Sequence, residues 1–327
     1  MTTYKISLCL VREKIMKKAL YAIYSLIPIF ISALKIDIVA NFDIEHLPVR
    51  LLPVKESFDV EIVSLSDYFQ NKSAEDPNLS KILVFNPYFD RDLIRKLPKE
   101  KLILFVWEPE TSLPSSLYED YSKVYTWDDT LIDNQKFFRF NYPYLMAMQE
   151  NNISFEEKKL CIMVTGHWTT ERLTLLKFFE LNHPNDLDCY GWNKPGETPL
   201  WKGCIPGLHS GPEKISTLQK YRFCICFENI TGIIKGYITE KIFGCFTAGC
   251  IPVYWGAENI EDYIPKACFI DYRDFESDEK LYRFLVNMSS EQHQNYIRAI
   301  EDYLHSEQAE IFSPAFFDNL VYEAITR

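Results

Sequence analysis

A polar segment in the second half of the chain has the residue types of an anion-binding site. The apolar, aromatic run Tyr221–Phe227 predicts a buried strand, and the polar pair Glu228–Asn229 follows where that strand must end. Further along, Thr239 precedes Glu240 and Lys241 at the predicted start of a helix, which Gly249 ends before a second apolar strand. The pattern therefore predicts a strand, loop, helix and strand that place an acid and a base on one helical turn.

The chemistry of such a turn is the binding of anions. Backbone N–H groups and the positive end of the helix dipole point out of the helix start, and Lys241 adds a full charge, so phosphate is the natural ligand. Glu240 beside it could accept hydrogen bonds from sugar hydroxyls next to the phosphates. The pair indicates a nucleotide sugar. The alternative is an ordinary capped helix, because threonine at the N-cap with glutamate in the first turn is a common stabilising arrangement.

The whole stretch resembles the C-terminal signature of the family 10 glycosyltransferases, the α-1,3/1,4-fucosyltransferases. The matching pieces occur in the order and at the spacing of the family: Phe227–Asn229, Gly236–Ile242, Ala248–Ala257 and Asp262–Pro265. The likeness weakens upstream, at Leu104–Pro109 and Lys123–Asp128, and is slight before about residue 80. The resemblance implies the GT-B fold, in which two Rossmann-like domains face each other across a cleft, and a GDP-fucose donor.

The resemblance also implies individual roles. Glu108, directly after the apolar strand ending at Trp107, falls on the catalytic base of the family, with Glu110 as a nearby rival. Arg172 falls in the segment of the diphosphate-binding arginine, whose fork could hold two phosphate oxygens, and Lys241 would supply the second positive charge. The remaining donor-binding residues implied are Asn229, Tyr237 and Glu240, and Glu228 could serve the same pocket. An exposed strand-end carboxylate, a solvated helix-start arginine and buried structural polar groups are the alternatives.

Metal and nucleic-acid functions receive little support. The net charge of −11 argues against a nucleic-acid partner, because affinity for nucleic acid depends on lysine and arginine. The nine cysteines have no paired spacing typical of a zinc site, and several lie inside apolar strands, where cysteine packs as a small hydrophobe. Asp186–Asp188 spells the DxD of metal-dependent glycosyltransferases, but the family resembled does not require it. We expect no required metal or cofactor, although a divalent metal could stimulate.

The N-terminal 34 residues have the shape of a signal peptide or short membrane anchor. A basic stretch containing Arg12 and Lys18 precedes the uncharged run Ala19–Leu34, which contains Pro28. The run is slightly shorter than the roughly 17 to 25 residues of a spanning helix. A buried element of the first domain is the alternative. We therefore expect membrane association through this segment, with a cytoplasmic or peripheral protein as the other reading.

Two series of strands predict two α/β domains. The expected strands of the first domain, residues 35–150, are 35–41, 59–64, 81–85, 101–107 and 124–127; those of the second, residues 151–327, are 160–165, 187–190, 221–227, 250–254 and 267–270. No GxGxxG follows a strand, so a dinucleotide-binding enzyme is disfavoured. Ligands of such sheets bind at the carboxyl ends of strands, where Glu108 and Glu228–Asn229 fall.

Together these features predict an inverting transferase that moves fucose from GDP-fucose to a GlcNAc- or glucose-containing oligosaccharide. Acceptor choice belongs to the first domain, where the resemblance is weakest. The rivals are a transferase of another GDP-sugar such as GDP-mannose, and a non-catalytic protein that binds nucleotide sugars or glycans.

Overall fold

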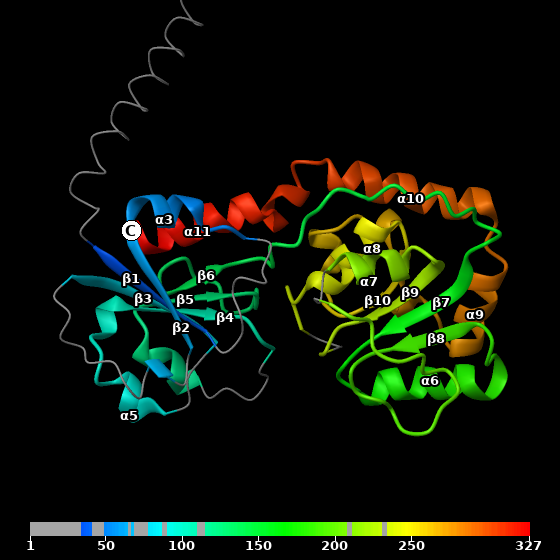
Figure 1. The fold of residues 1–327 in the computed structure, drawn as a ribbon, viewed down its shortest axis with the longest axis horizontal. Coiled ribbons are helices and arrows are strands. Elements are labelled where there is room, and N and C mark those ends of the chain that lie inside the picture. The colour runs from blue at the N-terminus through cyan, green and yellow to red at the C-terminus, as the bar shows by residue number, and fades with distance from the viewer. Residues whose placement is uncertain are drawn as a thin grey trace, which may run out of the picture.

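The structure is a computed structural model, and it describes residues 34–40, 49–64, 67–68, 78–86, 90–109, 115–207, 211–230 and 234–327. Two α/β units lie side by side, each built on its own sheet (Figure 1). The basic and apolar N-terminal segment predicted as a signal peptide or anchor lies outside the described residues, except Leu34. Within the described ranges, no helix is both long and apolar enough to cross a bilayer.

The first sheet is parallel throughout, with strand order β2-β1-β3-β4-β5-β6. Its strands are β1 (Lys35–Ala40), β2 (Asp59–Ser64), β3 (Leu79–Phe85), β4 (Leu102–Val106), β5 (Lys123–Thr126) and β6 (Phe137–Arg139). The helices α3 (Leu52–Ser57) and α5 (Arg91–Ile94) connect them, with short 3-10 turns. The edge strand β6 has only three residues, all of them half-buried, and sequence patterning did not predict it.

The second sheet is also parallel, in the order β11-β10-β9-β7-β8. Its strands are β7 (Lys159–Val164), β8 (Leu187–Tyr190), β9 (Tyr221–Phe227), β10 (Ile251–Trp255) and β11 (Ile270–Asp271). The helices around it are α6 (Thr170–Asn182), α7 (Pro212–Leu218), α8 (Glu240–Ala248), α9 (Asp278–Val286) and α10 (Ser290–Leu304). Two parallel sheets with covering helices confirm the predicted α/β class.

The central strand β9 shows why this sheet is covered on both faces. Successive side chains of a strand point to opposite sides, so its apolar residues feed two cores. Phe223 and Ile225 pack in the cluster that contains residues of α6 and α9, whereas Cys224 and Cys226 pack with residues of α7 and α8. These small buried thiols allow α8 to lie close to the sheet, in keeping with their predicted role as small hydrophobes.

The C-terminal helix departs from the predicted domain boundary. Helix α11 (Pro314–Thr326) lies beside α3 over the first sheet, not over the second (Figure 1). Its Phe317 ring packs 6.0 Å from Phe105 and 5.8 Å from Trp107, and the Asp318 carboxylate accepts the Leu51 N–H at 3.0 Å. The assignment of residues 151–327 to the second domain is therefore corrected for this helix. Local sequence does not show which of the two sheets this helix covers.

Candidate active site

A cavity of about 530 Å³ brings together residues from both domains. Glu108 contributes from the carboxyl end of β4 in the first domain. The second domain contributes residues from the ends of β7, β8 and β9 and from two helices, among them Asn229, Lys214, Glu240 and Lys241. These positions follow the rule that ligands of parallel sheets bind beyond the carboxyl ends of strands. The cavity thus has an acid on one side and cationic groups on the other.

Glu108 is held in place through its backbone. Its N–H donates to Asn86 Oδ1 at 2.7 Å, and the N–H of Trp107 donates to the same oxygen at 2.9 Å. Asn86 has a φ of +73°, a left-handed conformation that asparagine tolerates better than most residues. The anchored backbone leaves the Glu108 side chain exposed at the cavity, as a base requires. The rival Glu110 lies outside the described residues.

The start of α8 forms the opposite wall. Thr239 is the N-cap, and its hydroxyl accepts the N–H of Lys241 at 3.4 Å. The Lys241 ammonium lies 3.2 Å from Glu228 Oε2 and 3.5 Å from Glu240 Oε1. Burial alone would lower the pKa of Lys241, but the two carboxylates outweigh it and raise this pKa above the ordinary lysine value. Lys241 is therefore cationic at neutral pH while it lines the cavity.

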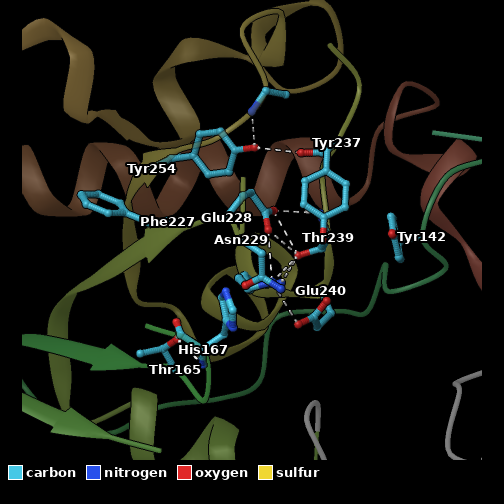
Figure 2. A network of polar contacts seen from close by, with 12 residues as sticks. Tyr142, Thr165, His167, Phe227, Glu228, Asn229, Tyr237, Thr239, Glu240 and Tyr254 are labelled. Carbon is cyan, nitrogen blue, oxygen red and sulfur yellow. Dashed lines mark hydrogen bonds and ion pairs between the residues drawn. The ribbon is translucent and has the colours of Figure 1, made fainter. Parts of the chain in front are cut away.

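Glu228 has a supporting position in this structure, and its contact with the donor stays a prediction. The residue is fully buried, and its carboxylate accepts the Thr239 N–H at 2.9 Å and the Thr239 hydroxyl at 2.8 Å (Figure 2). The ion pair with Lys241 occupies the same carboxylate. A buried charge is tolerated only when it is paired and hydrogen-bonded, and this one is both. Glu228 therefore fixes the helix start from beneath.

Arg172 likewise serves the site from behind it. The side chain is 2% exposed, and its guanidinium donates to the Thr165 hydroxyl at 3.0 Å and to the carbonyls of His167 and Phe227. It also donates to Asn229 Oδ1 at 3.1 Å, which fixes the amide that lines the cavity. In this structure the guanidinium is hydrogen-bonded within its own domain, and its contact with two phosphate oxygens stays a prediction. Burial lowers the pKa of Arg172, but arginine remains charged.

Tyr237 lies in the interface between the domains. The residue is 2% exposed, and its ring centroid is 4.8 Å from that of Trp127 and 6.0 Å from that of Tyr142, both in the first domain. Burial, with the nearby Tyr142 and Glu228, raises the pKa of Tyr237 well above its ordinary value. Tyr237 therefore makes a packing contact that joins the two domains, and its contact with the donor stays a prediction.

Of the predicted residues, the structure brings Glu108, Asn229, Glu240 and Lys241 together at the cavity surface. Lys214 of α7 and Trp192, which is 70% exposed, also line it and were not predicted. Trp192 follows the end of a predicted strand, and that position could have indicated a place in the site. No sequence pattern indicated Lys214, because it is a single lysine in a short helix.

The DxD sequence is engaged in contacts within the domain. Asp188 accepts the Tyr221 hydroxyl and the Lys159 ammonium, each at 2.7 Å, and Asp186 accepts the Tyr282 hydroxyl at 2.8 Å. The described part of the chain contains no cluster of three or more His, Cys, Asp or Glu side chains suited to a metal. Asp186 and Asp188 thus have structural partners.

Comparison with known proteins shows what the chain is similar to. Residues 154–311 match the model of the glycosyltransferase family 10 (fucosyltransferase) C-terminal domain. The 4-galactosyl-N-acetylglucosaminide 3-alpha-L-fucosyltransferase 9 of Mus musculus is 34% identical over 149 residues, 44% of this chain and 38% of the relative. The alpha-(1,3)-fucosyltransferase FucT of Helicobacter pylori is 28% identical over 33% of this chain and 22% of the relative. The matched segments thus span less than two fifths of these relatives.

Several solved structures have a similar fold over most of the length of this chain. A crystal structure of an alpha1,3-fucosyltransferase has a TM-score of 0.55 at 16% identity and covers 90% of both chains. A crystal structure of an alpha1,3-fucosyltransferase with GDP-fucose has a TM-score of 0.52 at 16% identity, covering 90% of this chain and 91% of that one. An E. coli trehalose-6-phosphate protein bound with UDP-2-fluoro glucose reaches 0.52 at 9% identity, covering 89% and 98%. These likenesses confirm the predicted GT-B fold.

Proposed function

We propose that this chain, in which residues 154–311 form the C-terminal domain of a family 10 glycosyltransferase, is an inverting fucosyltransferase. Its donor would be GDP-fucose and its acceptor a GlcNAc- or glucose-containing oligosaccharide. One observation carries the proposal: Glu108 of one domain and the Glu240–Lys241 pair of the other line the same cavity. The related fucosyltransferases and the complex of one with GDP-fucose support the choice of donor.

The donor side of the reaction requires stabilisation of a departing diphosphate. Lys241 supplies a cation at the positive end of the α8 dipole, where an anion is most favoured. Lys214 supplies a second cation on the same cavity. Glu240 and the Asn229 amide, on the same wall, provide an acceptor and a donor for sugar hydroxyls. Glu228 and Arg172 act through these groups by fixing their positions.

The acceptor side requires a base. In the proposed reaction the acceptor hydroxyl oxygen attacks the anomeric carbon of fucose while the bond from that carbon to the phosphate oxygen breaks. GDP leaves with the bonding electrons, and Glu108 takes the hydroxyl proton. Attack on the face opposite the leaving group inverts the anomeric centre. Lys241 and the helix start face the charge that develops on the phosphate, so the residues described can perform both halves of the step.

The test of the base is Glu108→Gln, which keeps the shape of the side chain but removes its basicity. We expect transfer from GDP-fucose to fall by about 10²- to 10⁴-fold while the dissociation constant for GDP stays within about threefold. The matched control is Glu100→Gln, an exposed glutamate of the same domain that lies before β4. Unchanged transfer by Glu108→Gln would remove the residue from this role.

The choice of sugar is tested with both GDP-fucose and GDP-mannose against a glycan array. Transfer from GDP-fucose to acceptors containing GlcNAc or glucose is the expected result. Transfer from GDP-mannose alone would replace the fucose assignment, and GDP binding without turnover of either donor would favour the binding-protein alternative.

Lysine cations in the cavity take the part that a metal plays elsewhere, so we propose that no metal is required and that a divalent ion is at most stimulatory. We expect dialysis against EDTA to leave at least about half of the transfer rate. Loss of activity that Mg²⁺ or Mn²⁺ restores would contradict this.

Membrane attachment through residues 1–34 is proposed from their basic and apolar sequence. Fractionation of the full chain and of a chain beginning at Lys35 tests it. Equal recovery of both in the supernatant would contradict the proposal and favour a cytoplasmic or peripheral protein.

A further inference from the structure

Four side chains at the domain interface form a polar cluster that we name the domain clamp: Asp129, Arg139, Asn259 and Tyr263. Asp129 lies in the turn after β5 and Arg139 ends β6, so both belong to the first domain. Asn259 and Tyr263 follow β10 in the second domain. The clamp lies outside the cavity, since none of its members is among the residues that line it.

Asp129 is the centre of the clamp. Its carboxylate accepts the Asn259 amide at 2.9 Å and the Tyr263 hydroxyl at 2.7 and 2.8 Å, and it pairs with Arg139. The Arg139 guanidinium also lies over the Tyr263 ring, 4.7 Å from its centroid. Both members of the ion pair are about 80% buried, so water screens these contacts less than it screens a surface pair. One carboxylate thus holds three partners from two domains.

The clamp also holds the backbone that leads into the helix α8. Arg139 donates to the Gly236 carbonyl at 3.0 Å, and the Gly236 N–H donates to Asn259 Oδ1 at 2.9 Å. The N–H of Asp129 reaches the Lys235 carbonyl at 3.4 Å. Both polar groups of Gly236 are therefore bound by the clamp.

The glycine itself shows how close this approach is. Gly236 has a φ of +84°, and a Cβ built there would lie 2.1 Å from Arg139 Nη1 and 2.2 Å from the Trp127 carbonyl oxygen. A side chain would therefore force Arg139 and the first-domain backbone away. Glycine at this position lets the two domains meet.

We propose that the domain clamp is a positioning device for catalysis, which sets the start of α8 relative to Glu108. Only Tyr237, Ile238 and Thr239 separate Gly236 from Glu240, and all three are buried, so a shift at Gly236 passes into the helix start. Glu108 belongs to the domain that supplies Asp129 and Arg139. The clamp therefore fixes the position of the base relative to the cations of the cavity. This inference rests on the proposed transfer reaction.

The test is Asp129→Asn, with Asp133→Asn as the matched control from the same turn. The Asp133 carboxylate accepts backbone N–H groups of Gln135, Lys136 and Phe137 and so serves its own domain. We expect Asp129→Asn to lower kcat by about 10- to 100-fold, because small misplacements of reacting groups have effects of this size. The dissociation constant for GDP should stay within about threefold, since the cations come from one domain.

A second variant separates positioning from simple loss of fold. Tyr263→Phe removes one hydroxyl from the clamp and keeps the ring under Arg139, so it should lower kcat less than Asp129→Asn does, with the same unchanged GDP affinity. Equal losses of kcat and GDP affinity in these variants would indicate a structural role and overturn the inference. Wild-type kcat in Asp129→Asn would overturn it as well.

Small-angle X-ray scattering provides a readout that does not depend on the reaction. We expect Asp129→Asn to have a larger radius of gyration than wild type and Asp133→Asn to match wild type. An unchanged radius together with unchanged kcat refutes the clamp. If wild type itself transfers no fucose from GDP-fucose, the proposed function fails, while the scattering comparison still decides whether the clamp holds the domains together.

Discussion

Glu228→Gln replaces a buried carboxylate by an amide of the same shape, so its effect on the free energy of unfolding tests the supporting role of Glu228. Glu228→Gln leaves the Lys241 ammonium without its partner at 3.2 Å, and one amide hydrogen must face either that ammonium or the Thr239 N–H. Loss of one member of a buried ion pair costs about 3–5 kcal/mol. Glu240 remains 3.5 Å from the same ammonium, so we expect the lower end of this range, about 3 kcal/mol.

The assay is urea unfolding at pH 7, followed by tryptophan fluorescence. Trp255 at the end of β10 reports on the second domain, whose transition is compared between variants. Glu240→Gln is the matched control: it removes a partly exposed carboxylate from the same lysine and should cost less than about 1 kcal/mol. A Glu228→Gln transition within about 0.5 kcal/mol of wild type, or a larger cost for Glu240→Gln, would refute the supporting role assigned to Glu228.

Two further predictions concern charge. Burial, with Lys158 nearby, lowers the pKa of His293 to about 4 from 6.5, so the unfolded chain binds an extra proton as the pH falls through this window. The free energy of unfolding should therefore drop by about 3 kcal/mol between pH 7 and pH 4. His293→Gln should remove that part of the drop, measured by urea unfolding. Lys214→Ala should weaken GDP binding about tenfold in calorimetry, because it removes one cation from the cavity. The control is Lys220→Ala, which removes an exposed lysine beyond the same helix and should leave GDP binding unchanged. Equal effects of the two variants would exclude Lys214 from the phosphate site.

Much of the fold was predictable because most of its strands are short, apolar and buried, although the edge strand β2 is largely exposed. The predicted limits of Asp59–Ser64, Leu187–Tyr190 and Tyr221–Phe227 are those of β2, β8 and β9. The edge strand Phe137–Arg139 was missed because its register depends on pairing with β5, which local sequence does not encode. The place of α11 was missed for the same reason: an amphipathic helix shows that it covers a sheet, but not which one.

Four of the predicted site residues line one cavity, whereas the others lie behind or beside it. Residue type and position placed Glu240 and Lys241 at a helix start and Glu108 at a strand end, and the structure puts them on one cavity. Sequence could not distinguish a side chain that faces this cavity from one that lies behind it. Arg172 and Glu228 are behind it, because each satisfies neighbouring groups that are remote in sequence.

The position of the helix α11 has a consequence for the order in which the chain can be completed during synthesis. Phe317 packs against aromatic residues of β4, so a helix that is synthesised after the second domain completes the first domain. Until then, the rings of Phe105 and Trp107 lack this cover. A fragment cut at the domain linker would expose the same surface. The first domain therefore depends on a helix that follows the second domain in the sequence.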